Sequence, residues 1–310
     1  MRNLQSILRI FPKELRELLE HCQMDFALLQ EIRLRVNQPF LARYDNREYF
    51  ISRKGLTNRT GEEYFLTDRQ LKETMEILSR YSLYAFEEET RQGFLTIQGG
   101  HRVGVAGKVT LSDKSIRNMK YISFLNIRVA HERKGCADKI LPRLIEKDRL
   151  CHTMIISPPG CGKTTLLRDL VRQISDGTPY FHGQTVGLVD ERSELAACYL
   201  GVPQNDVGIR TDVLDCCPKA EGMIMLIRSM APRVIAADEV GLPEEIHSLK
   251  YAMYCGCSIL STVHGTSIED IKKRPVLREL LRERLFERYV VLEPGFRVKE
   301  IYDGEGLVWE

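Results

Sequence analysis

The segment that most constrains this chain is a glycine-containing loop between a short apolar run and an amphipathic stretch. Met154–Ile156 predicts a buried strand, and the stretch from Lys163 onward predicts a helix. The loop between them reads Ser-Pro-Pro-Gly-Cys-Gly-Lys-Thr-Thr over residues 157–165. This matches the strand–loop–helix context of the phosphate-binding loop G-x-x-x-x-G-K-[ST], with Ser157 in the place of the first glycine. The chain is therefore predicted to bind a nucleotide through an α/β domain.

Each residue type in the loop has a chemical reason to be there. Gly160 and Gly162 let backbone N–H groups wrap a phosphate, and the helix N-terminus adds the positive end of its dipole. Lys163 is expected to reach the β- and γ-phosphates, and the Thr164 hydroxyl to ligate Mg²⁺. ATP and Mg²⁺ are thus the expected cofactors. The residues predicted to contact them are Ser157, Pro158, Pro159, Gly160, Cys161, Gly162, Lys163, Thr164 and Thr165.

The predicted helix after the loop has two distinct faces. Leucine, valine and isoleucine side chains form one stripe at positions 166, 167, 170, 171 and 174. Arg168, Asp169 and Arg172 are expected to face solvent on the other side. The pattern predicts a helix that packs on a sheet through a single face.

Acidic residues follow two further apolar strands. Val234–Ala237 is followed by Asp238, expected to hold Mg²⁺, and by Glu239, expected to polarise the attacking water as general base. Val186–Val189 is followed by the acidic cluster 190–194. That cluster either adds metal or water contacts or caps the next helix, and the sequence leaves both alternatives open.

A third predicted strand ends in Thr-Val-His264, so a histidine lies at its carboxyl end. The short runs of the back half are apolar on both faces and alternate with helices, which predicts a mainly parallel sheet covered on both sides. Ligands bind such sheets at the carboxyl ends of the strands. We therefore expect His264 to sense the γ-phosphate.

The first half of the chain has a different pattern and the opposite charge. Residues 1–150 carry 27 Lys+Arg and 20 Asp+Glu, whereas residues 151–310 carry 18 and 23. Apolar spacing predicts a helix over 5–22. Thr67 is expected to cap a second helix, which runs to about Tyr81.

Strands fill the rest of the first half. Short alternating runs predict strands between 31 and 52, and Gly99-Gly100 predicts a hairpin turn. We expect a mixed α+β N-terminal domain over 1–135 and a P-loop NTPase domain over 136–310. The charged region 130–139 is the expected linker.

Composition and charge exclude several classes of protein. No apolar stretch is long enough to span a membrane, and charged residues such as Arg9 and Lys13 interrupt any signal-peptide core. Nine cysteines without a Cys-x-x-Cys motif favour reduced thiols, so we expect a cytoplasmic protein. The basic residues of 272–288 are interleaved with glutamates, which indicates a solvated helix face. No direct contact with nucleic acid is expected.

The order of these motifs resembles that of the RecA-like ATPases that drive type II and type IV secretion and pilus dynamics. The acidic cluster, the segment 226–232, the second-strand acid and the Thr-Val-His strand end follow in the family's order. The chain departs from that pattern at Asp238-Glu239-Val-Gly and lacks the family's zinc-binding cysteine module.

The resemblance implies a RecA-like second domain, a homohexamer and catalytic roles for two more residues. Glu194 matches the family's box glutamate, and Arg128 matches the arginine that these enzymes present from the N-terminal domain. Arg192, Arg210 and Arg228 are further candidates for an arginine that acts on a neighbouring subunit's nucleotide.

A closer resemblance, over nearly the whole chain, is to the stage III sporulation protein AA family of endospore-forming bacteria. It implies an ATPase of the mother-cell cytoplasm that powers or gates a secretion-like channel complex between mother cell and forespore. It also implies that the protein lies against the membrane through membrane proteins of that complex. The segments that carry it are 99–104, 126–130, 157–169, 189–194, 210–215, 219–223 and Asp238-Glu239.

Three classes of function stay open at this point. The first is an ATP-hydrolysing motor or assembly ATPase. The second is an interaction protein that ATP regulates and that turns over slowly, as Ser157 in the loop would allow. The third is a nucleic-acid motor, which the basic first half would suit, although no recognised DNA-binding motif supports it.

Overall fold

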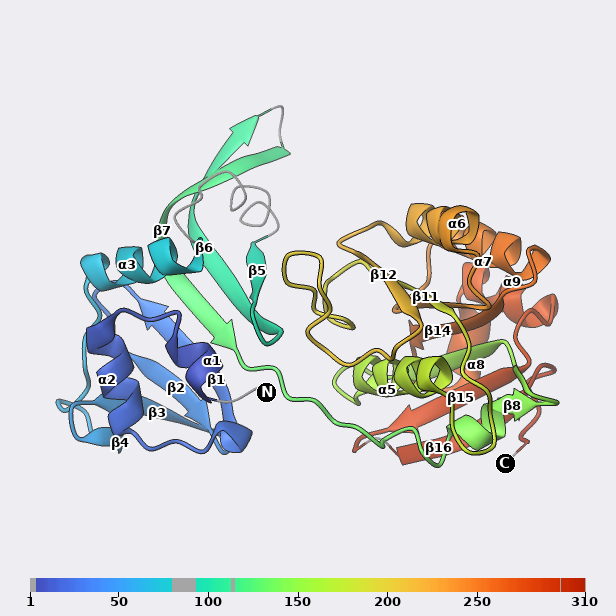
Figure 1. Ribbon diagram of the computed structural model, residues 1–310, viewed down its shortest axis with the longest axis horizontal. Helices are drawn as coiled ribbons and strands as arrows, with labels where there is room; N and C mark the ends of the chain where they lie inside the picture. The colour runs from blue at the N-terminus through green and yellow to red at the C-terminus, as the bar shows by residue number, and fades with distance from the viewer. Residues whose placement is uncertain (1–3, 80–92, 113–114, 296, 310) are drawn as a thin grey trace. The chain divides into compact units, whose positions relative to one another are not determined.

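The computed structural model describes residues 4–79, 93–112, 115–295 and 297–309. The chain divides into two compact units, residues 1–131 and 132–310. Each has a seven-stranded sheet and a hydrophobic core of its own (Figure 1). Among the described residues, no helix is both long and apolar enough to cross a bilayer.

The first unit is a mixed α+β unit whose sheet is antiparallel throughout, with strand order β4-β3-β2-β1-β7-β6-β5. One core joins the sheet to its helices, among them Leu15 of α2 and Leu71 of α3. The elements are α1 (Leu4–Leu8), α2 (Lys13–His21), η1 (Phe26–Leu28), β1 (Leu29–Arg35), β2 (Leu41–Tyr44), β3 (Arg47–Ser52), β4 (Gly55–Thr57), α3 (Asp68–Leu78), β5 (Phe94–Ile97), β6 (His101–Ser112) and β7 (Ser115–Arg128).

The single helix predicted over 5–22 is wrong, because the chain forms α1 and α2 with a break between them. Pro12 is the cause. It has no N–H to donate, and it pushes the preceding residue away from helical angles. The capping predicted for Thr67 is confirmed: its side chain accepts the Gln70 N–H, and the Gln70 side chain returns a bond to the Thr67 N–H. The helix ends at Leu78, and residues 80–92, which include the predicted end, lie outside the described part of the chain.

The second unit is built on a mainly parallel sheet in the order β12-β11-β13-β14-β10-β15-β16, in which only β16 runs antiparallel to its neighbour. Its elements are η2 (Leu141–Leu144), β8 (Ile145–Glu146), β9 (Arg149–Leu150), β10 (Thr153–Ser157), α5 (Lys163–Asp176), β11 (Val186–Asp190), β12 (Thr211–Asp215), α6 (Lys219–Met230), β13 (Val234–Ala237), α7 (Pro243–Tyr254), β14 (Ser258–His264), α8 (Ile268–Lys273), α9 (Pro275–Arg282), β15 (Arg288–Glu293) and β16 (Arg297–Asp303).

Helices cover both faces of this sheet, as the apolar runs predict (Figure 1). Alternate strand residues point to opposite faces. Ile155 therefore belongs to the core under α5, whereas Met154 and Ile156 belong to the core under α6 and α7. Every residue of β10 and β13 is buried. A slip of either strand by one residue would move each of its side chains into the core on the opposite face, so the register is fixed.

Gly222 lets α6 approach the sheet closely enough to set the position of β11. A Cβ at this residue would lie 2.8 Å from Val189 Cγ1 and 3.1 Å from Cys217 Sγ. Alanine is the better helix former by about 1 kcal/mol, but overpacking a core costs about 1–3 kcal/mol.

We therefore expect Gly222→Ala to lower the free energy of unfolding, measured by urea denaturation, by about 1 kcal/mol or more. The exposed Ser229→Ala on the same helix is the control, and it should change stability by less than about 0.5 kcal/mol. A Gly222→Ala protein more stable than the parent would contradict the close approach.

Candidate nucleotide-binding site

The loop between β10 and α5 has the backbone of a phosphate cradle. Gly162, the N-cap of α5, has φ of +88°, and Gly160 has φ of +75°, both in the left-handed region that favours glycine. No atom lies within 4 Å of the place that a Cβ on Gly160 would fill. The loop therefore has open space beside Gly160, at the positive end of a fourteen-residue helix.

Ser157 fits this loop without strain. It is the last residue of β10, in extended backbone, and it is fully buried. Its Oγ donates to the Pro158 carbonyl at 3.0 Å. The first position of the loop therefore needs no glycine here. Cys161 is buried, and Pro159 and Gly160 are exposed at the tip.

A chain of hydroxyl and carboxylate groups joins α5 to two strand ends. Thr164 Oγ1 donates to Asp238 Oδ2 at 2.7 Å. Thr262 of β14 donates to the other oxygen of the same carboxylate. The Thr262 oxygen in turn accepts the Glu239 N–H at 2.9 Å. Mg²⁺ takes one or two protein oxygens and keeps several waters, so Thr164 and Asp238 are a fitting donor pair.

Lys163, Glu239 and His264 meet at the centre of the site. The Lys163 ammonium, 7% exposed, contacts Glu239 Oε1, and its Nζ lies 3.0 Å from His264 Nε2. His264 Nε2 is 2.9 Å from the same carboxylate oxygen. Arg192 Nη1 lies 3.1 Å from the second oxygen, Glu239 Oε2. Three of the residues predicted from separate strand ends are thus in direct contact.

The charges around Glu239 hold its carboxyl in the ionised form. Burial by itself would raise its pKa, but the hydrogen bond and charge of Lys163, with His264 and Arg192, outweigh burial and lower the pKa. Glu239 also has φ of +52°, in the left-handed region that non-glycine residues rarely adopt. Strained backbone of this kind often occurs at functional sites.

The acidic cluster after β11 divides into two roles. Asp190 is 2% exposed, and its carboxylate accepts the N–H groups of Glu194, Leu195 and Ala196 at 2.8–2.9 Å. Burial raises the pKa of Asp190 by more than the hydrogen bonds from these N–H groups lower it. Asp190 therefore orders a loop. Of the two alternatives for the acidic cluster, capping of the next helix is wrong, because no helix lies between Asp190 and β12, where every residue is described. Glu194 is exposed and lines a small hollow together with Asp238 and Glu239.

Lys219 is a site residue that the predicted set missed. It opens α6, is 8% exposed, and its Nζ contacts Glu191 and lies 3.0 Å from Glu245 Oε1. Glu245 Oε2 accepts the N–H groups of Gly241 and Leu242, at 2.7 and 2.9 Å. Lys219 therefore supports the loop that carries Glu239. The local sequence at the start of α6 gave no signal of this, because Glu191 comes from the loop after β11 and Glu245 from α7.

An open pocket of about 490 Å³ lies beside this network. Its lining includes charged side chains and apolar residues of the loop after β13 and of α9. The charged members are Glu191, Arg192, Lys219, Glu239, Glu245, His264 and Arg274.

Of the candidate arginines, Arg192 is the one that the structure brings to Glu239. Arg210 donates instead to the Ser175 carbonyl at 2.8 Å. Arg228 is exposed on α6. Arg128 is exposed at the end of β7 in the first unit.

The sequence as a whole matches a known family. The family model described as sporulation stage III, protein AA, matches residues 1–309. The chain belongs to the stage III sporulation protein AA family. The stage III sporulation protein AA of Bacillus subtilis (strain 168) is 40% identical over 310 residues, which cover 98% of this chain and 97% of that protein.

Two solved structures share the fold of this family member. The pilus retraction motor PilT with bound ADP has a TM-score of 0.58 at 15% identity and covers 94% of this chain and 78% of its own. The Legionella pneumophila ATPase DotB has a TM-score of 0.57 at 16% identity and covers 90% and 75%. The resemblance to secretion and pilus ATPases is thus confirmed at the level of the fold.

Removing the Lys219 ammonium should destabilise the second unit. Lys219→Met leaves Glu245 buried without its counter-charge, and breaking such a pair costs about 3–5 kcal/mol. We expect a loss of about 3 kcal/mol in urea denaturation. The double variant Lys219→Met/Glu245→Gln should recover much of it, and equal stabilities of parent and Lys219→Met would refute the pairing.

Asp215, at the end of β12, should make stability depend on pH. Burial raises its pKa to about 6, and the charge of Asp190 adds to that rise, whereas a hydrogen bond from Ser193 opposes it. The buried Oδ1 of Asp215 has no hydrogen-bond partner among the described residues. The folded pKa lies above the ordinary value of 3.8, so the folded state binds this proton more tightly than the unfolded state does. Ionisation therefore costs stability, fully above pH 6 and progressively less down to about pH 4.

We expect Asp215→Asn to raise the free energy of unfolding by about 2 kcal/mol at pH 7.5. The gain should shrink as the pH falls from 6 towards 4. The exposed Asp212→Asn on the same strand is the matched control. A gain of equal size at pH 4 and pH 7.5 would show that ionisation is not its cause.

Proposed function

We propose that this protein is an ATP-hydrolysing motor or assembly ATPase with a RecA-like second unit. The observation that carries the proposal is the meeting of a phosphate cradle with Asp238, Glu239 and His264 at one sheet edge. Membership of the sporulation family and the folds of PilT and DotB support it. PilT is described with bound ADP, which supports a nucleotide in the corresponding loop here.

Binding is assigned to the loop after β10. The N–H groups around Gly160 and Gly162 surround the phosphates, and Lys163 binds them through its ammonium. Thr164 and Asp238 hold Mg²⁺, which neutralises charge on the phosphate oxygens when bound. The remaining loop residues, Ser157 to Cys161 and Thr165, complete the cradle.

Hydrolysis is assigned to the residues around Glu239. Its carboxylate is ionised and accepts the proton of the attacking water. His264 lies at hydrogen-bond distance from both Lys163 and Glu239, where it senses the γ-phosphate. Glu194, in the same hollow, orients water or the metal's water shell.

Further roles follow from the family resemblance. We assign Arg128 to the nucleotide of a neighbouring subunit in a homohexamer. The ATPase would act in the cytoplasm of the mother cell during endospore formation, held at the membrane by membrane proteins of a secretion-like channel complex.

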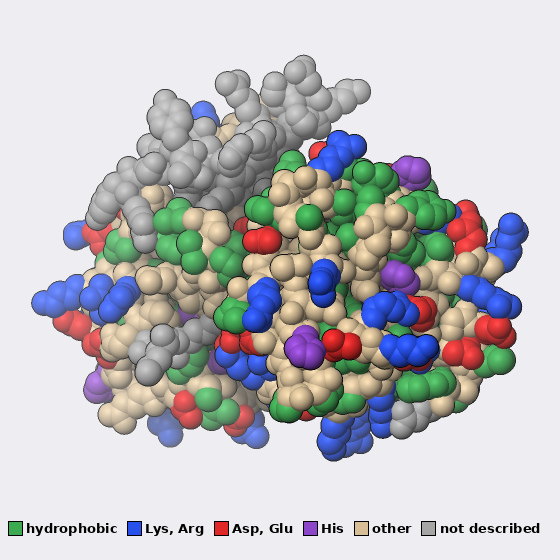
Figure 2. All heavy atoms as spheres, turned by 45° about the vertical axis from the view of Figure 1, so that its right-hand side comes forward, with side chains coloured by type: hydrophobic (Ala, Val, Ile, Leu, Met, Phe, Trp, Pro, Cys, Tyr) green, Lys and Arg blue, Asp and Glu red, His purple; other side chains and the backbone are tan. Residues whose placement is uncertain are grey.

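A protein that binds ATP for assembly and turns over slowly is the second candidate. The ion pairs of Lys163 and Arg192 with Glu239 favour it, because they keep the base engaged. A nucleic-acid motor has less support. On the face drawn in Figure 2, Lys and Arg side chains are interspersed with carboxylates and apolar groups.

The experiment separates binding from turnover. Lys163→Ala should abolish binding of Mg-ATP. Glu239→Gln keeps the size and hydrogen bonds of the side chain and should bind Mg-ATP within about threefold of the parent. It should hydrolyse ATP at least about 100-fold more slowly, because general-base catalysis contributes 10²–10⁴.

Glu244→Gln, exposed on α7, is the control and should leave both quantities unchanged. Hydrolysis by Glu239→Gln at the parent rate would refute the assignment of the base. Nucleotide binding by the parent with no measurable turnover would favour the assembly protein.

A further inference from the structure

The P-loop helix α5 holds the segment through which the chain enters the second unit. We call residues 132–140 the connector. Residues 130–139 were expected to be the linker, yet Ala137, and Ile140 just after it, are 0% and 3% exposed and pack in the same core as Leu166 and Leu170 of α5. The connector is therefore a packed part of the nucleotide-binding unit from about Cys136 onward.

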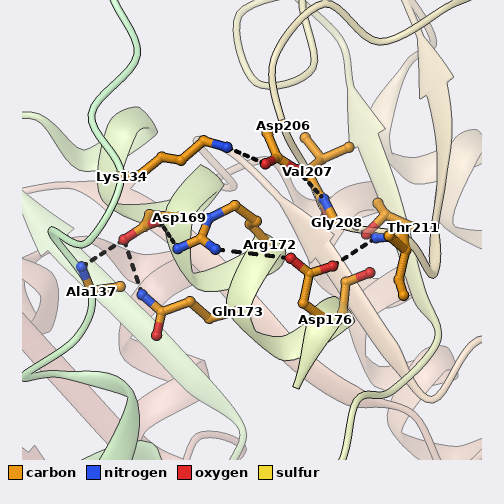
Figure 3. Close-up of polar contacts among 12 residues, drawn as sticks. Lys134, Ala137, Asp169, Arg172, Gln173, Asp176, Asp206, Val207, Gly208 and Thr211 are labelled. Carbon is orange, nitrogen blue, oxygen red and sulfur yellow. Dashed lines mark hydrogen bonds and ion pairs between the residues drawn. The ribbon is translucent and has the colours of Figure 1, made fainter. Parts of the chain in front are cut away.

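Asp169 is the polar anchor of this packing (Figure 3). The prediction that it faces solvent is wrong, since it is 3% exposed. Its Oδ2 accepts the Ala137 N–H at 2.9 Å, and its Oδ1 accepts from Arg172 Nη2 at 2.7 Å. Gln173 donates both to Asp169, at 3.1 Å, and to Asp138 of the connector, at 2.8 Å. A buried carboxylate is stable only when paired in this way, so the connector backbone completes its shell.

Two more contacts tie the connector to its surroundings. Lys134 pairs with Asp206 (Figure 3). Glu132 Oε1 accepts the Asp206 N–H at 2.8 Å. Cys136 Sγ lies 3.7 Å from the Thr165 carbonyl in the first turn of α5. The connector thus touches the turn that begins with Lys163.

The residue before Asp169 holds a different segment. Arg168 donates to the carbonyls of Glu194 and Leu195 at 2.6 and 2.7 Å. Adjacent residues of α5 therefore bind the acidic loop through a guanidinium and the connector through a carboxylate. Both lie about one and a half turns after Lys163 and Thr164.

We propose that Asp169 is a positioning residue that fixes the connector to the P-loop helix, so that a displacement of α5 at its phosphate-binding end moves the connector with it. The anchor itself needs no nucleotide. The coupling rests on the proposed function, because it requires a nucleotide at Lys163 and Thr164. A hinge between the two units would then lie before Glu132 rather than within the connector.

Amide hydrogen exchange of the full chain, read by mass spectrometry over residues 134–141, tests the anchor. Asp169→Ala should speed exchange there at least tenfold. Asp169→Asn should do so much less, because its amide oxygen still accepts the Ala137 N–H. Asp176→Ala is the control: it lies on the same helix and accepts the Ile209 N–H at 2.9 Å. Lys134→Ala, at an exposed residue, should raise exchange severalfold at the start of the connector even if Asp169→Ala does not fold.

Alkylation of Cys136 gives a second readout. Burial, with the charge of Asp169, raises the pKa of this thiol to about 12, which slows its reaction. Both Asp169 variants remove the negative charge and so change the pKa of the thiol alike. Faster labelling in Asp169→Ala than in Asp169→Asn therefore reports release of the connector from α5. The exposed Cys255 is the internal reference.

Saturating Mg-ADP tests the coupling. It should change connector exchange severalfold in the parent and not in Asp169→Ala, with nucleotide binding retained. Unchanged exchange in both Asp169→Ala and Lys134→Ala overturns the anchor. An equal Mg-ADP effect in parent and Asp169→Ala overturns the coupling. Absence of Mg-ADP binding by the parent refutes the proposed function and the coupling, while the comparison without nucleotide still decides the anchor.

Discussion

The parallel pairing of β10, β13 and β14 is the constraint on which the site depends. Parallel strands are joined by crossovers, so their carboxyl ends lie at one edge of the sheet. The register pairs Ser157 with His264 and Ala237 with Ser261. β13 therefore ends three residues before β10 and β14, and Asp238 and Glu239 follow it beside the last residues of β14. This placement lets Lys163 contact groups 76 and 101 positions away in the sequence.

Features set by near neighbours in the sequence were predictable. The strand, loop and helix around residues 157–163, the buried strands of the second unit, the hairpin after β5 and the cap at Thr67 all depend on residues within one turn or one strand. The strand-end rule then predicted that Asp238, Glu239 and His264 would meet. This prediction needed no knowledge of the side-chain positions, because all strands of a parallel sheet end at the same edge.

Features set by distant segments were not predictable. A charged residue on the polar side of an amphipathic helix is normally solvated, so periodicity alone places Asp169 outside. Its burial depends on the connector, 32 positions earlier. Lys219 is similar, since its two carboxylates come from the loop after β11 and from α7. The break at Pro12 differs from both: the signal was local, and the apolar spacing outweighed it in the prediction.

The acidic excess of the second half now has a structural meaning. Three shielded carboxylates face cations: Glu245 faces Lys219, Asp169 faces Arg172, and Glu239 faces Lys163 and Arg192. Asp190 instead accepts backbone N–H groups. For Glu239 the pairing has a chemical consequence under the proposed function. Burial favours a higher pKa, and the Lys163 hydrogen bond is the main influence that lowers it. A phosphate bound by Lys163 competes with Glu239 for the same ammonium, so nucleotide binding and the pairing of the base are linked.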